Sequence, residues 1–386
     1  MNGNIRIGNL FGIPFFINPS WFLILGLVTW SYGSNLTSDF TGSTPWILGF
    51  VTAILLFSSV LAHELGHSFV AISQGIPVKS ITLFIFGGLA TLEKESETPF
   101  QAFSVAIAGP LVSILLFGIF SLIAASFSPN QPLGAIIYPV AIINLILALF
   151  NMIPGLPLDG GNVLKAVVWK ITGNPNKGVI FAGRVGQVIG WIAISLGILS
   201  VLGISQAGSL WTLLIGVFLL QNAGMAAQSA VVQDKLSQYT ARDAVIADSP
   251  IVGEHLSVRE FVNDYVIGKE RWKKFLVIDE NQKLVGDIAV EDLKQIPTSD
   301  WNEIYLHELV RSIPEVDTIA ADTSLLEVAK TIEIKKAQEL VVVGESGEVI
   351  GLLEKASIVN LMTQEEIAKN KAVVESVQDD DKVIVN

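Results

Sequence analysis

The sequence predicts a polytopic α-helical membrane protein with six transmembrane helices and a membrane-edge β-hairpin, followed by a soluble α/β region. Of the 386 residues, 51% are hydrophobic and 16% are charged, and the mean hydropathy is +0.57, which is more apolar than an ordinary soluble protein. Residues 1–234 carry seven basic and seven acidic residues, so the whole net charge of -12 belongs to the remainder. An acidic chain of this kind is not expected to bind nucleic acid.

Six apolar segments in residues 1–234 approach or exceed the length of about 20 residues that a helix needs to cross a bilayer. They run near 14–33, 46–74, 101–127, 134–152, 178–203 and 208–228. The connecting segments 34–45, 128–133 and 204–207 contain no Lys or Arg, so the positive-inside rule places the opposite ends in the cytoplasm. We therefore expect a multi-pass protein of the lipid bilayer, most simply of the cell membrane, with both termini cytoplasmic.

The second apolar segment contains the pattern HExxH, formed by His63, Glu64 and His67. Ionisable residues in a membrane segment cost about 2.5 to 3.5 kcal/mol each on insertion scales, which makes them candidates for a functional site. Residues four apart share one helix face, so both imidazoles can point at one metal ion while Glu64 reaches its open coordination position. The alternative is that both histidines are satisfied polar groups between packed helices. The spacing favours a zinc site.

A catalytic zinc ion takes three protein ligands, so the pattern needs one more. Asp159 is the only acidic residue between Glu97 and Asp234. The predicted topology brings the ends of the second and fourth spans to the same cytoplasmic side, where Asp159 can meet the histidines. As an alternative, Asp159 caps a helix that begins at Gly160. We expect a zinc site that faces the cytoplasm.

These motifs resemble the site-2 protease family of intramembrane zinc metalloproteases, peptidase family M50. The resemblance lies in HExxH within one membrane helix and a distal Asn-x-x-Pro-x-x-Pro-Leu-Asp-Gly-Gly over residues 151–161, supported by Ala108-Gly109-Pro110. It departs from the family at Ser113, where many members carry Asn. The resemblance covers residues 5 to about 230 and implies a zinc metalloendopeptidase that acts on membrane proteins.

Carried over residue by residue, the resemblance implies a role for each matching position. His63, His67 and Asp159 would hold one Zn²⁺ per chain, with Glu64 as the general base. Asn151 and Pro154 would match the family's substrate-contacting segment. Gly87 and Gly88, in the hairpin predicted below, are further candidate substrate contacts.

Residues 77–98 predict a β-hairpin, with strands over 80–86 and 89–93 about the Gly87-Gly88 pair. A transmembrane helix hides its backbone in internal hydrogen bonds, so its cleavage requires local unwinding. The open edge of the hairpin can hold an unwound substrate as an added strand. A structural plug is the rival interpretation.

The soluble region contains an internal repeat. Phe275–Ile278 and Val285-Gly286 recur 65 positions later as Leu340–Val343 and Ile350-Gly351. The repeat resembles a tandem pair of CBS domains, at 240–303 and 304–365, followed by a polar tail at 366–386. In that family an acid matched here by Asp292 contacts the ribose of an adenine nucleotide such as ATP, but Ala289 replaces the usual Thr. A structural or homodimerising module is the alternative.

The chain is thus expected to be an intramembrane zinc-dependent endopeptidase of the branch that carries a C-terminal CBS pair. Its expected substrates are membrane-bound regulatory proteins cut in or near their transmembrane segments, with nucleotide binding to the CBS pair modulating activity. The alternative function is a CBS-regulated transporter or channel with a metal site.

Overall fold

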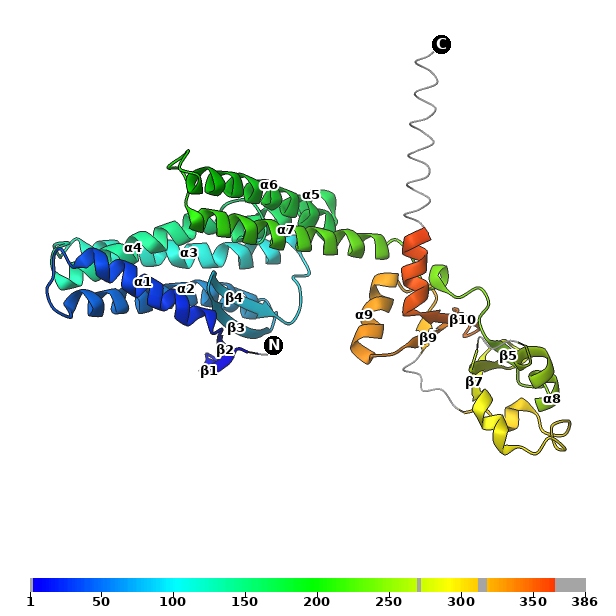
Figure 1. Cartoon of the computed structure of the whole chain (residues 1–386). Helices are drawn as coiled ribbons and strands as arrows, with labels where there is room; N and C mark the ends of the chain where they lie inside the picture. The colour runs from blue at the N-terminus through cyan, green and yellow to red at the C-terminus, as the bar shows by residue number, and fades with distance from the viewer. Residues whose placement is uncertain (1–2, 269–271, 312–317, 365–386) are drawn as a thin grey trace, which may run out of the picture. The chain divides into compact units, whose positions relative to one another are not determined.

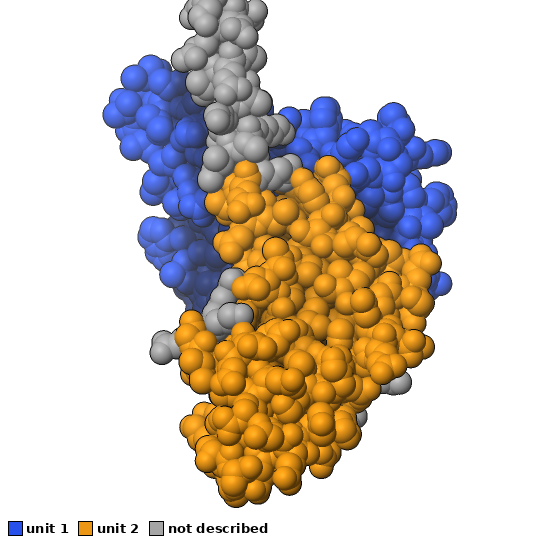
Figure 2. Space-filling view, turned by 90° about the vertical axis from the view of Figure 1, so that its right-hand side faces the viewer, with its two compact units in different colours: residues 1–232 blue, residues 233–386 orange. Residues whose placement is uncertain are grey.

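The computed structural model describes residues 3–268, 272–311 and 318–364. The predicted polar tail at 366–386 lies outside the described residues. The chain divides into two compact units, residues 1–232 and 233–386, which Figure 2 distinguishes by colour.

The first unit is a helical bundle with a small sheet (Figure 1). Its helices are α1 (Ser20–Leu36), α2 (Thr44–Ser73), α3 (Pro99–Ala124), α4 (Pro132–Asn151), α5 (Asp159–Thr172), α6 (Pro175–Val201) and α7 (Leu210–Leu236). Within the described part of the chain, five of these, α2, α3, α4, α6 and α7, are long and apolar enough to cross a membrane. Helix α1 has 17 residues, which is at the short limit for a span. The polytopic helical class is confirmed, and the count of six spans stays a prediction.

The first predicted span does not begin as a helix. Strand β2 (Ile13–Ile17) pairs antiparallel with β1 (Ile5–Leu10), and its residues alternate between buried and partly exposed. Asn18 ends the strand, because its side-chain oxygen accepts the Ser20 N–H at 3.0 Å and turns the chain into α1. The apolar content of residues 14–33 was compatible with either structure, and pairing of β2 with a distant strand selected the sheet.

That distant strand is β3 (Val78–Phe84), which lies parallel to β2 and antiparallel to β4 (Gly87–Leu92). The sheet order β1-β2-β3-β4 leaves β4 at one edge. The predicted hairpin is present, but its turn lies at Ile85 and Phe86, two residues earlier than expected. Gly87 opens β4 with a φ of +138°, a conformation that favours glycine. The Phe86 ring stacks on Phe218 of α7 with ring centroids 4.5 Å apart, and this contact helps to hold the turn.

The helices approach one another through glycines. A Cβ added at Gly49 of α2 would lie 2.7 Å from the Thr29 carbonyl oxygen and 3.0 Å from the Gly33 nitrogen of α1. Membrane helices lack a hydrophobic driving force between them, so such close backbone contact supplies much of their association. Helix α3 packs in turn against α2, α4 and α5.

The described residues of the second unit form two three-stranded sheets with the same topology. In the first, β5 (Ile251–Gly253) lies parallel to β6 (Lys274–Ile278), which is antiparallel to β7 (Leu284–Ala289). In the second, β8 (Thr318–Ala320), β9 (Glu339–Val343) and β10 (Val349–Glu354) repeat that arrangement. Short helix α8 (Val258–Phe261) and helix α9 (Leu325–Lys335) follow β5 and β8. The repeat predicted from the sequence is therefore also a repeat of topology.

The two sheets share an apolar cluster formed by Leu276 of the first and Val341, Val349 and Leu352 of the second. The Lys274 ammonium of β6 also lies 3.5 Å from the Glu339 carboxylate of β9. The two halves of the repeat are packed as one body.

We predict that Gly49→Ala lowers the stability of the membrane unit by about 1 to 3 kcal/mol, because its Cβ forces α1 and α2 apart. Gly26→Ala is the matched control, since Gly26 of α1 has open space around its Cβ position and Ala favours a helix. Thermal unfolding in detergent should show a lower Tm for the first variant and an equal or higher Tm for the second. Equal effects would contradict the proposed close contact.

Candidate metal centre and active site

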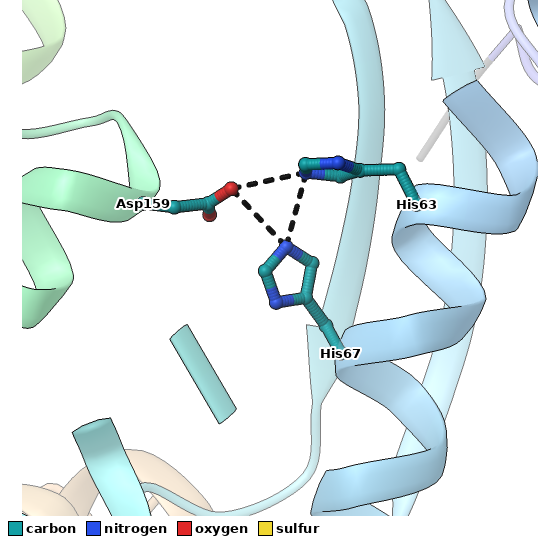
Figure 3. Close-up of side chains that lie close together, drawn as sticks. All are labelled: His63, His67 and Asp159. Carbon is teal, nitrogen blue, oxygen red and sulfur yellow. Dashed lines mark hydrogen bonds and ion pairs between the residues drawn. The ribbon is translucent and has the colours of Figure 1, made fainter. Parts of the chain in front are cut away.

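Three side chains from two helices converge in the first unit (Figure 3). His63 and His67 lie one turn apart on α2, and Asp159 is the first residue of α5. The His63 Nε2 and His67 Nε2 atoms lie 3.0 and 3.3 Å from Asp159 Oδ2, and 3.2 Å from each other. Among the described residues, this group alone brings three such ligand atoms within 4.8 Å of one another. The structure thus brings together the three predicted ligands.

Asp159 does not act as the cap of its helix. Helix α5 begins at Asp159 itself, Leu158 occupies the capping position, and no side-chain capping hydrogen bond is formed there. Burial raises the pKa of the Asp159 carboxyl. Hydrogen bonds and charges from both histidines lower this pKa by more than burial raises it, so the pKa lies below the usual value. A carboxyl group that stays ionised is a suitable metal ligand.

Two glycines let α5 approach its preceding loop closely enough to place Asp159. A Cβ at Gly160 would lie 2.3 Å from the Met152 carbonyl oxygen, and one at Gly161 would lie 2.3 Å from the Gly155 carbonyl carbon. These are backbone atoms, so a side chain at either position would move the helix start and the ligand with it.

The far side of each imidazole is also held. His63 Nδ1 lies 2.9 Å from the Ser113 hydroxyl, which is fully buried. His67 Nδ1 lies 2.7 Å from the Val105 carbonyl oxygen, which can only accept a hydrogen bond. Partners of this kind fix the ring orientation and leave Nε2 as the ligand atom. Ser113 is the position where the chain departs from the family pattern, and it still supplies a polar partner to the first histidine.

Gly109 of α3 forms the wall next to the two ligand nitrogens. A Cβ at this position would lie 2.2 Å from His67 Nε2 and 2.7 Å from His63 Nε2. The sequence showed Gly109 only as part of Ala108-Gly109-Pro110, and its proximity to the histidines arises from the packing of α3 against α2.

Glu64 lies beside the three ligands without joining them. Its Oε2 accepts the main-chain N–H of Ala90 in β4 at 3.1 Å. A Cβ at Gly88 would lie 2.4 Å from the Glu64 Cγ, so a larger residue there would displace the Glu64 side chain. The HExxH pattern predicts Glu64 beside the metal site, but nothing in the pattern indicates its contact with the strand.

A cavity of about 410 Å³ opens onto this cluster. Its lining includes the three predicted ligands and Glu64. It also includes the β4 residues from Gly88 to Leu92 except Thr91, and the charged segment Glu93–Ser96. Asn151 also lines the cavity, while its amide nitrogen donates to the Leu147 carbonyl at 3.0 Å. Pro154 and Gly87, also predicted to contact substrate, are not among the described lining residues, whereas Pro157 and Gly88 are.

The donor set fits a zinc ion. Two buried imidazoles and one carboxylate offer three ligand atoms around a common point, and the adjoining cavity leaves access for a water molecule. This is the ligand composition of catalytic zinc sites with two His and one acidic residue.

Comparison with known proteins identifies the class. Residues 51–140 and 117–193 match the sequence family described as Peptidase family M50. A Synechocystis protein with the provisional name of a zinc metalloprotease is 58% identical over 364 residues, covering 94% of this chain and 96% of that protein. Rip3 of Mycobacterium tuberculosis, also provisionally named a zinc metalloprotease, is 29% identical over 370 residues. The alignment covers 94% of this chain and 93% of that protein. The chain belongs to peptidase family M50, and it is a zinc metalloprotease of the site-2 protease type.

Two further similarities concern the C-terminal region and the chain as a whole. The CBS domain family matches residues 308–363. A zinc metalloprotease of Methanocaldococcus jannaschii is 28% identical over 365 residues, covering 94% of this chain and 97% of that protein. Relatives that are named zinc metalloproteases and align with 94% of this chain favour the enzyme over the transporter or channel alternative.

The predicted nucleotide contact, Asp292, lies in the second unit. One of its carboxylate oxygens forms an ion pair with Arg311, and the other accepts the Ala289 N–H at 3.3 Å. Both oxygens are thus engaged by other residues of the second unit.

We predict that Gly109→Ala abolishes metal binding, because its methyl group would occupy the space beside both ligand nitrogens. Gly118→Ala on the same helix is the control, since its Cβ position is open. Elemental analysis of the purified proteins should find about one zinc ion per chain in the control and little in Gly109→Ala. A normal zinc content in both would show that the two imidazoles do not bind metal through Nε2.

Proposed function

We propose that this protease holds one zinc ion through His63, His67 and Asp159, and hydrolyses peptide bonds in or near transmembrane segments of membrane proteins. The observation that carries the proposal is the meeting of three ligand atoms beside a non-ligating carboxylate, within a cavity of the helical unit. A bound zinc ion would lower the pKa of a coordinated water and polarise the scissile carbonyl.

The chain's own residues supply the proton transfer. The Glu64 carboxylate lines the cavity and is not one of the three ligands. It can therefore accept a proton from the attacking water and deliver it to the leaving nitrogen. Asn151 lines the same cavity and can donate a hydrogen bond to the substrate backbone if its bond to Leu147 is exchanged.

The substrate is proposed to bind as an unwound strand along the free edge of β4. Support comes from the sheet order, in which β4 has β3 as its one neighbour among the described strands, and from the position of Gly88, Ala90 and Leu92 on the cavity wall. An edge strand recognises an extended segment through main-chain hydrogen bonds, which require no particular substrate sequence. The rival role, a structural plug, predicts that an extended peptide does not bind.

The protein is proposed to lie in the cell membrane with both termini and the active site toward the cytoplasm. The distribution of Lys and Arg supports this orientation. It requires six spans, with α1 as the shortest. Regulatory membrane proteins are the proposed substrate class.

The C-terminal region is proposed to be a pair of CBS domains, at 240–303 and 304–365, following a membrane domain at 1–234. Its proposed role is regulation through an adenine nucleotide, with homodimerisation as the alternative. A ribose that binds Asp292 has to replace the Arg311 guanidinium, so we expect weak binding.

We predict that Glu64→Gln reduces cleavage of membrane substrates by at least about 100-fold without loss of zinc, because the variant loses a base and no ligand. Asp159→Ala should lose both zinc and activity. Glu97→Gln is the control, since Glu97 is exposed and is not among the described lining residues of the cavity. Zinc content and the accumulation of uncut proteins in membranes measure the two effects. Unaltered cleavage by Glu64→Gln would overturn the mechanism.

We predict that millimolar ATP raises the Tm of the full-length protein by a few degrees, through preferential binding to the folded state, and that Asp292→Ala removes the increase. Thermal unfolding with and without ATP measures it. An unchanged Tm in millimolar ATP would favour the structural or dimerising role.

A further inference from the structure

The free edge of β4 and the carboxylate of Glu64 share one hydrogen-bond donor. In the β3–β4 pair, Ala90 lies opposite Ile81, yet its N–H donates to Glu64 Oε2. In an antiparallel pair, a residue whose N–H is not used by its partner strand directs both main-chain groups outward. Ala90 thus belongs to the positions of β4 whose backbone groups face away from β3.

Glu64 is held on two sides by this strand. Its Cγ lies against Gly88, where there is no room for a Cβ, and its Oε2 takes the Ala90 N–H. Both strand residues also line the cavity. The carboxylate therefore occupies the place at which a neighbouring strand would form its hydrogen bond to Ala90.

We infer that the main-chain amide of Ala90 positions Glu64 while the edge of β4 is empty, and that a substrate strand takes over this amide and releases the carboxylate into the cavity. The inference rests on the proposed binding of substrate along β4. An N–H group forms one strong hydrogen bond at a time, so the substrate carbonyl and Glu64 compete for it. Binding of the substrate and freeing of the base are then one event, and Ala90 is a positioning residue.

The competition is tested by the affinity of full-length, detergent-purified variants for a fluorescent, Val- and Thr-rich extended peptide. Glu64→Gln and Glu64→Ala both lack the base, so the peptide stays intact. The Gln side chain keeps an oxygen that can accept the Ala90 N–H, whereas Ala does not. We expect Glu64→Ala to bind the peptide about tenfold more tightly than Glu64→Gln, since no existing hydrogen bond has to be broken. Equal zinc contents establish that both variants retain the site.

A second substitution removes the donor. Ala90→Pro deletes the N–H at an edge position, where proline is tolerated, and Ala90→Gly is the matched control that keeps it. Introduced into Glu64→Ala, the proline should abolish the tenfold gain, whereas the glycine should preserve it. Hydrogen exchange in the absence of peptide supplies an independent measurement. In segment 87–92, about one more amide should exchange rapidly in Glu64→Ala than in Glu64→Gln.

The outcomes separate the inference from the proposed function. Equal peptide affinities for Glu64→Ala and Glu64→Gln would overturn the competition and leave strand binding intact. A gain that survives Ala90→Pro would also overturn it, because the donor would not be Ala90. If no variant binds the peptide, substrate binding along β4 is wrong, and the inference fails with it.

Discussion

The candidate metal site depends on bringing polar groups together within an apolar helical bundle. Each of His63, His67 and Asp159 would be costly if it faced hydrocarbon alone. Together they satisfy one another, and Ser113 and Val105 satisfy the remaining histidine nitrogens. The groups that would hold a zinc ion therefore also lower the cost of placing polar side chains in this part of the fold.

Close backbone packing makes that convergence possible. Gly109 leaves space beside the two imidazoles, and Gly160 and Gly161 let the start of α5 lie against its preceding loop. A glycine in a helix costs about 1 kcal/mol relative to alanine, but here it permits ligands from separate helices to meet. The absence of three Cβ atoms is thus one condition for the geometry of the site.

The small sheet places a strand edge beside Glu64. Its parallel β2–β3 pair ties the N-terminal strands to the segment after α2, and this leaves β4 at the edge beside Glu64. A sheet edge is usually protected because its free backbone groups can pair with other chains. In this protein the edge lines the cavity, where pairing with an unwound substrate would serve the reaction.

The sequence alone determined the membrane class, the repeat in the C-terminal region and the identity of the candidate zinc ligands, because hydrophobic length, repeat spacing and HExxH are local patterns. It did not determine that residues 13–17 form a strand, since an apolar run suits a helix or a buried strand until its partner is known. The turn at Ile85 and Phe86, the contact of Gly109 with the histidines and the bond between Ala90 and Glu64 arise between segments distant in the sequence. Tertiary structure decided these features, because they depend on which backbones can approach closely, and a linear pattern of residue types does not record that distance.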